Sequence, residues 1–289
     1  MQKNESSSFL PFFAAESRPA LAKAVIFGCP YEDPGAFRHG AAKAPFAIRD
    51  FSRHIRSYHP QSQSDIRDLA FFDAGDMDVA GKSEVEVFAE LEQKAMSFFL
   101  DKRFLLTLGG SRAVAYPLIS AAKKVWPRLK VISLDAHSGR EERGEAVSHD
   151  DLFTALLEEG ILRERDVFHW GCRVGSKGAL EKAGVKHVHV PPRVKKDSLE
   201  HLHSLCKYPV YLTVDMDVMD PPFAPGSGHP VYGGIGTAEL LETLTLFQSL
   251  SVVGMDLTEI VPDYDCSGIT SVLGATIVKE SLVRFVQRN

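Results

Sequence analysis

Short apolar runs alternate with amphipathic stretches along most of this chain, and this alternation limits the possible folds more than any other feature. Runs rich in Val, Ile, Leu and Phe are typical of buried strands, and a 3.6-residue period is typical of helices that cover a sheet. Strands that alternate with helices along the sequence favour parallel βαβ units. We therefore predict an α/β fold, a three-layer α/β/α sandwich around a mostly parallel sheet of about eight strands. The predicted strands are Ala24–Cys29, Leu69–Asp73, Phe104–Leu108, Val131–Asp135, Val167–Gly171, His187–Val190, Val210–Asp215 and Val252–Leu257, and the predicted helices are Glu84–Leu100, Val114–Val125, Asp151–Glu159, Leu199–Cys206, Ala238–Gln248 and Ile269–Gln287.

The alternation also predicts the domain organisation. No Pro-rich or Ser-rich linker interrupts it, and no repeat period is present. We predict an N-terminal arm over residues 1–22 and one α/β domain over residues 23–289. With 289 residues, of which 44% are hydrophobic, the chain has enough apolar side chains for a core of that size.

The charge balance and the cysteine pattern argue against several classes of protein. The formal net charge is −5, which indicates no basic surface for nucleic acid. The four cysteines are scattered without a CxxC pair, so we predict neither a zinc knuckle nor a disulfide framework. No apolar run reaches the length of a membrane span, and the N-terminal residues lack the apolar core of a signal peptide. We therefore expect a cytoplasmic protein without nucleic-acid or membrane partners.

Carboxylates follow the predicted strand Val210–Asp215. Asp215, Asp217 and Asp220 stand at its end, before a loop rich in proline and glycine. On a continuing strand, Asp215 and Asp217 would leave on the same face and repel each other, and a bound cation is the usual remedy. The alternative is a solvated turn with capping aspartates.

A second pair with the same spacing strengthens the prediction of a metal site. Asp135 and His137 follow the predicted strand Val131–Asp135. Carboxylates together with one imidazole suit Mn²⁺ or Zn²⁺ better than Ca²⁺. Because the carboxyl ends of parallel strands share one edge of a sheet, we expect both pairs to meet there, together with the loop Leu108-Gly-Gly-Ser-Arg112.

These motifs resemble the ureohydrolase family of arginases, agmatinases and formimidoylglutamases, with the agmatinase branch most similar. The resemblance begins at Val25 and includes Asp73-Ala-Gly-Asp76, residues 215–234 and Val253-Gly-Met-Asp-Leu-Thr-Glu259. It implies an arginase-like fold and hydrolysis of guanidinium-type C–N bonds, usually with two Mn²⁺ ions that share a hydroxide. It also implies a homo-oligomer, either a trimer or a hexamer.

Two of the six metal ligands that the resemblance implies are absent. Asp135, His137, Asp215 and Asp217 match the family and form the complete set for one metal, site B. The family has Gly-Gly-Asp-His where this chain has Gly109-Gly-Ser-Arg112. It has Asp-Ala-His-x-Asp where this chain has Asp135-Ala-His-Ser-Gly139. Both losses fall on site A. We expect one manganese ion, with zinc or no metal as alternatives, and Arg112 in the place of the second ion, where its guanidinium would supply the missing charge. The alternative is an Arg112 side chain in solvent.

The residues that the resemblance assigns to the substrate pocket match the family better than those that it assigns to the metal site. Glu259 matches the carboxylate that binds the substrate guanidinium, and His149, fourteen residues after Asp135, matches the histidine that passes a proton to the leaving amine. Agmatine fits better than arginine, because the contacts to an α-amino acid have no clear counterpart. Asp150 stands where the family has glycine. His229, His39, Glu141 and Glu142 are further candidates, more simply explained as loop or surface residues.

Two functional hypotheses follow. The first is an agmatinase-like hydrolase with one metal and weakened or altered activity. The second is a non-catalytic ureohydrolase paralogue that binds a guanidine or a partner protein. Deacetylase chemistry on the same sheet topology is disfavoured, because it uses adjacent histidines and this sequence contains no His-His pair.

Overall fold

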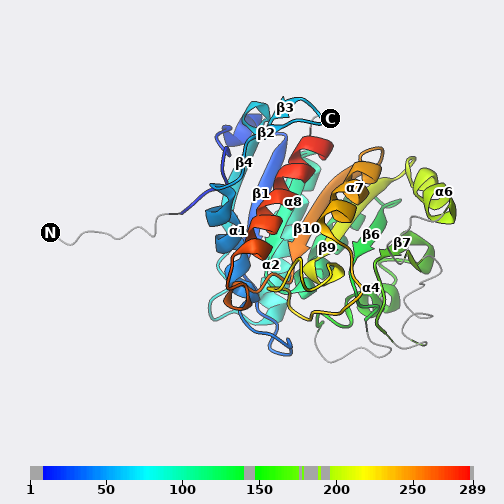
Figure 1. The fold of residues 1–289 in the computed structure, drawn as a ribbon. Coiled ribbons are helices and arrows are strands. Elements are labelled where there is room, and N and C mark those ends of the chain that lie inside the picture. The colour runs from blue at the N-terminus through cyan, green and yellow to red at the C-terminus, as the bar shows by residue number, and fades with distance from the viewer. Residues whose placement is uncertain (1–8, 140–146, 176–177, 179–187, 190–195, 287–289) are drawn as a thin grey trace.

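The computed structural model describes residues 9–139, 147–175, 178, 188–189 and 196–286. Its centre is one sheet of eight strands in the order β4-β1-β5-β10-β9-β6-β7-β8, and every pair of neighbouring strands in it is parallel (Figure 1). The strands are β1 (Ala24–Cys29), β4 (Phe71–Asp76), β5 (Phe104–Gly109), β6 (Lys130–Leu134), β7 (Val167–Trp170), β8 (Val188–His189), β9 (Pro209–Asp215) and β10 (Ser251–Thr258), with a separate antiparallel pair of β2 (Tyr58–His59) and β3 (Ser64–Asp65).

Helices cover both faces of the sheet and complete three layers. The helices packed with one core are α1 (Ala44–Ser52), α6 (Lys196–Leu205), α7 (Thr237–Phe247) and α8 (Ile269–Phe285), and those packed with the other are α2 (Glu84–Leu100), α3 (Ala115–Val125) and α4 (Leu152–Glu158). Strand residues alternate between the cores: Ala24 and Ile26 join the first, and Val25 and Phe27 the second. The predicted arginase-like sandwich is confirmed, with strand and helix ends within a few residues of those expected.

Helix α2 shows how closely local sequence fixes an element. The Ser83 hydroxyl accepts from the Glu86 N–H, and the Glu86 carboxylate accepts from the Ser83 N–H, a capping box that begins the helix. Val87, Leu91 and Ala95 follow at four-residue spacing and are all buried against the sheet. The predicted bounds, Glu84–Leu100, are those of the structure.

The first described residues lie against the edge of the sheet. The Phe12 side chain is buried in the core, and its N–H donates to Asp73 Oδ2 at 2.8 Å. The same carboxylate accepts a forked pair of bonds from the buried Arg49, with Nε to Oδ2 at 2.7 Å and Nη2 to Oδ1 at 2.9 Å. The division into an arm over residues 1–22 and a domain over residues 23–289 remains a prediction.

Asp256 is a buried carboxyl in the middle of β10. It is fully buried, and Thr213 Oγ1 donates to its Oδ1 at 2.9 Å. Burial raises the pKa of Asp256 to about 7. The folded state therefore keeps a proton that the unfolded chain loses near pH 4, so this group stabilises the fold fully at low pH and that contribution is lost as the pH rises to about 7.

Asp256→Asn is accordingly expected to change the pH dependence of stability. Relative to Asp256→Asn, the unmodified protein should lose roughly 1 kcal/mol per pH unit between about pH 5 and pH 7, and nothing further above that. Urea unfolding of both proteins across that range measures the difference. Parallel stability curves would contradict a neutral Asp256.

Among the described residues, no helix combines the length and the apolar character needed to cross a bilayer.

Candidate functional site

The candidate site lies at the carboxyl edge of the four central strands, β5, β10, β9 and β6, which are neighbours in the sheet. Their ends are level, because Leu257 pairs with Leu108, Thr258 with Asp215, and Leu134 with Val214. Each strand end therefore delivers its next residues to the same place. The candidates that arrive there are Arg112 after β5, Asp135 and His137 after β6, Asp215 and Asp217 at the end of β9, and Glu259 after β10.

The strand that carries Asp215 ends at that residue, as predicted, so the same-face arrangement expected for a continuing strand does not apply to Asp217. The strand ends at Asp215, and Met216–Val218 form a 3₁₀ turn. The turn forms because Asp215 Oδ1 accepts the Asp217 N–H at 2.8 Å, a local bond that competes with strand pairing. Both oxygens of Asp217 accept the His229 N–H, at 2.9 and 3.1 Å. Each carboxylate is thus buried and held by backbone donors.

Asp135 and His137 repeat this arrangement after β6. Asp135 Oδ1 accepts the His137 N–H at 2.9 Å. The His137 ring turns back, so that its Nδ1 lies 3.4 Å from Asp135 Oδ1 and 3.7 Å from Asp217 Oδ2. The structure therefore brings Asp135 and Asp217, one carboxylate from each predicted pair, close to one imidazole nitrogen.

Arg112 lies inside this cluster and does not point to solvent. Its side chain is 3% exposed, with Nη1 2.6 Å from Asp135 Oδ2 and Nε 3.8 Å from Asp215 Oδ2. Nη1 also donates to the His149 carbonyl at 3.2 Å, and the guanidinium carbon lies 5.5 Å from the centre of the Phe153 ring. The guanidinium is a fixed positive charge between two of the four predicted ligands.

One guanidinium leaves much of the negative charge uncompensated. Burial alone would raise the pKa of Asp135, but Arg112 and His137 lower it to about 2. Burial and the charges of Asp135 and Asp217 raise the pKa of Asp215 well above its ordinary value. Burial also raises the pKa of Asp217 to about 6, against the opposing effect of His137. The raised pKa values show that these buried carboxylates repel one another, which a bound cation would relieve.

The donor types and distances fit one metal ion with small side-chain movements. Ligand atoms bonded to one ion at about 2.1 Å lie roughly 3.0–3.5 Å apart, close to the 3.4 and 3.7 Å around His137 Nδ1. Among the residues that the structure describes, no three His, Cys, Asp or Glu side chains form a ready-made metal cage. Arg112 occupies part of this space, since its Nη1 pairs with Asp135 Oδ2, while Asp135 Oδ1 faces His137.

Glu259 sits in a strained backbone conformation at the end of β10. Its φ is +60°, which a residue with a side chain rarely adopts, and its carboxylate is buried. Glu259 Oε1 accepts the backbone N–H of Arg112 at 2.7 Å. Burial and the charge of Asp217 raise the pKa of Glu259 to about 7. Strain held in place by surrounding contacts is typical of a functional residue.

His149 lies between two carboxylates, and one of them, Asp33, was not predicted from the sequence. Its Nδ1 is 2.8 Å from Asp33 Oδ2, and its Nε2 is 3.4 Å from Asp150 Oδ1. Asp33 also accepts the His149 N–H at 3.0 Å. Burial would lower the pKa of His149, but Asp33 and Asp150 raise it. Asp33 could have been found as a carboxylate just beyond β1, the neighbour of β5 at the same edge.

The remaining candidates have mixed outcomes. The His229 ring lies 4.8 Å from that of His137 and stacks on Phe37 at 5.1 Å, so it adjoins the site. The His39 side chain is exposed, 3.6 Å from Glu32 Oε1. Glu141 and Glu142 lie outside the described residues.

Gly139 lacks the carboxylate that the resemblance implies at this position, and its backbone also leaves no space for one. Its φ is +90°, and a Cβ built on it would lie 2.5 Å from the Asp150 carbonyl oxygen. The backbone there has no room for a side chain, so the loop after β6 is built around glycine.

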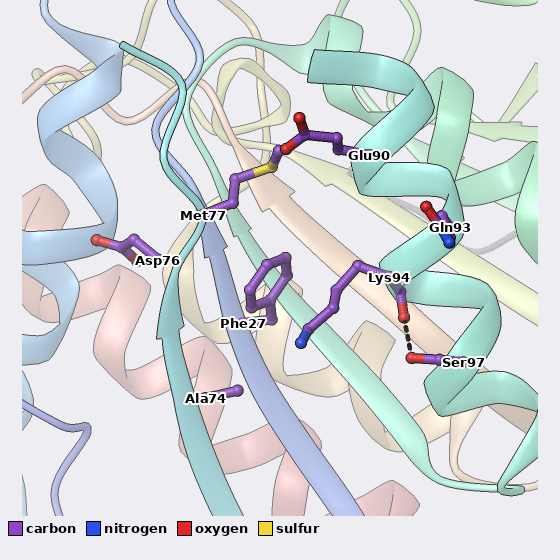
Figure 2. A pocket seen from close by; sticks show the side chains of 8 residues that line it. All are labelled: Phe27, Ala74, Asp76, Met77, Glu90, Gln93, Lys94 and Ser97. Carbon is purple, nitrogen blue, oxygen red and sulfur yellow. Dashed lines mark hydrogen bonds between the residues drawn. The ribbon is translucent and has the colours of Figure 1, made fainter. Parts of the chain in front are cut away.

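A separate cavity of about 500 Å³ lies between β1, β4 and α2 (Figure 2). Lys94 Nζ lies 5.9 Å from the centre of the Phe27 ring, and Asp76 and Glu90 also line the cavity. It contains none of the predicted site residues.

Known proteins share the sequence and the fold of this chain over nearly its whole length. A family model described as the arginase family matches residues 22–283. The chain is 32% identical to the agmatinase of Bacillus subtilis strain 168 and 31% identical to that of Halalkalibacterium halodurans, in each case over 99% of this chain and 100% of the relative. Its fold is similar to that of a Clostridium difficile protein provisionally named an agmatinase, with a TM-score of 0.86 and 25% identity over 94% of this chain and 99% of the other.

Proposed function

This chain belongs to the arginase family, and we propose that it is an agmatinase-like hydrolase of guanidinium-type C–N bonds that works with one metal ion and an internal arginine. The observation that carries the proposal is the cluster around His137 Nδ1, where Asp135 and Asp217 approach while Arg112 pairs with Asp135. A metal-dependent reaction is the general chemistry of this family.

In the proposed site, Asp135, His137, Asp215 and Asp217 hold one Mn²⁺, the site B ion of the resemblance. Their mixture of carboxylates and imidazole also suits Zn²⁺. When bound, the metal would lower the pKa of a coordinated water enough to give hydroxide near neutral pH. Arg112 takes the site A position, where its fixed charge offsets Asp135 and Asp215 but cannot activate water.

The substrate in this proposal is a small guanidine such as agmatine. Glu259 binds the guanidinium through the carboxylate oxygen that does not accept the Arg112 N–H. His149 delivers a proton to the leaving amine. Its Nδ1 is held by Asp33, which fixes the ring and leaves Nε2 as the nitrogen that exchanges protons. Since one ion replaces two, the expected activity is weak: the second ion of such a pair is worth several kcal/mol of charge stabilisation.

The second candidate is a non-catalytic paralogue that binds a guanidine or a partner protein. Two observations favour it: Arg112 already pairs with Asp135, and Glu259 already accepts a backbone N–H.

Metal analysis of protein loaded with excess Mn²⁺ and then desalted tests the proposal. We expect one Mn²⁺ per chain, loss of that ion in His137→Ala, and slow release of urea from agmatine. His39→Ala is the matched control, because that side chain is exposed and should leave the metal content unchanged. Two ions per chain would overturn the role given to Arg112. No ion and no urea would favour the non-catalytic candidate.

A further inference from the structure

Arg173, which lies just beyond β7, places its guanidinium among backbone carbonyl groups. Its nitrogens donate six hydrogen bonds of 2.7–3.2 Å, all to main-chain oxygens. The acceptors are the carbonyl groups of Gly171, Asp217, Val218, Met219, Val231 and Tyr232. Among the described residues, no carboxylate forms an ion pair with it. The groups that contact the guanidinium are carbonyl dipoles, and the carboxylates of Asp135, Asp217 and Asp220 lie near enough to act on its charge.

Three of these carbonyl groups belong to the turn that carries a candidate ligand. Asp217, Val218 and Met219 are consecutive, and their oxygens converge on the Arg173 guanidinium. Oxygens of neighbouring peptide groups that point to one place repel each other unless a donor or cation lies between them. The guanidinium therefore holds the turn in the shape that presents Asp217.

The main chain of Arg173 is bound to the other ligand segment. The Arg173 N–H donates to the Ala136 carbonyl at 2.8 Å, and the Ser138 N–H donates to the Val174 carbonyl at 2.9 Å. Ala136 and Ser138 flank His137. One residue thus joins, through its backbone and its side chain, the two segments that carry all four candidate ligands.

Arginine suits this position better than lysine does. A ring of carbonyl oxygens is the kind of surroundings that proteins build for a bound cation. Arginine supplies five N–H donors in a planar fork, whereas lysine supplies three from one nitrogen and stays more strongly hydrated. We call the ring of six carbonyl oxygens around Arg173 the carbonyl cradle. The Arg173 side chain is half-buried, so a small cation could reach this cradle if the arginine were removed.

We propose that the guanidinium of Arg173 acts as an internal cation in a carbonyl-lined site, and that it is a positioning residue that sets the distance between the Asp135–His137 and Asp215–Asp217 pairs. The cradle itself is independent of the proposed function. Its consequence for metal affinity rests on the proposed function.

Chemical rescue tests the cradle without metal. Arg173→Ala should have a lowered melting temperature, and guanidinium chloride at millimolar concentrations, far below those that denature proteins, should raise it again. Urea, which has nearly the same shape but no charge, should give no such rise. Arg128→Ala is the control. Arg128 is exposed, lies against the Tyr208 ring and precedes the amino end of β6, whereas the candidate site lies at the carboxyl ends of the strands. Equal effects of guanidinium and urea, or no effect of either, would overturn the proposal.

Metal affinity tests the positioning role. Arg173→Met keeps the side-chain stem and should weaken Mn²⁺ binding by about 10–100-fold, a range typical of residues that orient metal ligands. Arg173→Lys should lose less, because it keeps the charge. If both variants fold and bind Mn²⁺ as tightly as the unmodified protein, the positioning role is wrong. If the unmodified protein binds no Mn²⁺, the proposed function fails, and the rescue of Arg173→Ala by guanidinium still decides whether the cradle is a cation site.

Discussion

Arg112→Met should lower the free energy of unfolding of the metal-free protein by about 3–5 kcal/mol near pH 8, the usual cost of removing one partner of a buried ion pair. Methionine has a stem of similar length without the charge. Asp135 and Asp215 would stay buried and lose the guanidinium that lies 2.6 and 3.8 Å away. Urea unfolding measures the loss. It should shrink as the pH falls, because protonation removes the uncompensated charge of Asp135, whose pKa of about 2 depends on Arg112.

Manganese should restore much of the stability lost in Arg112→Met. A cation that binds only the folded state stabilises it by about 2.7 kcal/mol at a hundred times its dissociation constant. Because the variant has more uncompensated charge, Mn²⁺ should stabilise it more than it stabilises the unmodified protein. Equal gains in the two proteins would show that Arg112 does not occupy a cation position.

Arg49→Met provides the matched control for this experiment. Arg49 is also buried and forms a forked ion pair, with Asp73 on the edge strand β4. Its removal should cost a similar free energy. No imidazole adjoins Asp73 among the described contacts, so Mn²⁺ should add no more stability than it adds to the unmodified protein. The contrast separates the loss of any buried arginine from the loss of one that is proposed to take the place of a metal.

Much of the fold could be predicted because it depends on local patterns. The bounds of β1 and α2 follow directly from an apolar run and from a capping residue with regular apolar spacing. The convergence of the β5, β6, β9 and β10 loops could be expected from parallel strands alone. The 3₁₀ turn at Met216–Val218 could not be predicted in this way. It forms because Asp215 Oδ1 accepts the Asp217 N–H, a local side-chain bond that ends the strand.

The candidate site could be predicted as a set of residues but not as a set of contacts. Asp135 and Asp215 are recognisable by their strand ends, and Arg112 by its departure from the family pattern. The pairing of Asp33 with His149 joins residues 116 positions apart, and no local signal links them. Arg173 was not predicted at all, because its partners are carbonyl groups, which every residue has, and only the fold decides which of them converge.

Gly139→Asp, which would introduce the carboxylate that the resemblance implies for site A, is expected to destabilise the protein by about 2–5 kcal/mol without adding a second metal ion. A left-handed backbone with a side chain costs about 1–2 kcal/mol, and forcing atoms into occupied space costs roughly a further 1–3 kcal/mol. Gly139 has both problems, with φ at +90° and the Asp150 oxygen 2.5 Å from the position of a Cβ.

Two alanine variants separate these costs. Gly139→Ala bears both, while Gly81→Ala bears only the first, because Gly81 has a φ of +72° and no atom within 4 Å of the place that a Cβ would take. The difference between their unfolding free energies in urea is therefore the cost of the contact with Asp150. If the two variants are equally stable, the contact has no consequence.

If the proposed function is correct, the contact with Asp150 should also prevent a second metal site from forming when only the two ligands that the resemblance implies are introduced. Asp150 stands where the resemblance places a glycine, directly after His149, so the backbone that blocks residue 139 is the backbone that positions the proposed proton donor. Arg112→His with Gly139→Asp should therefore still bind one Mn²⁺ per chain, whereas adding Asp150→Gly, which frees that backbone to move, should allow a second. Metal analysis of the double and triple variants checks this order. A second ion in the double variant would contradict it, since the two ligand losses would then be independent of the loop.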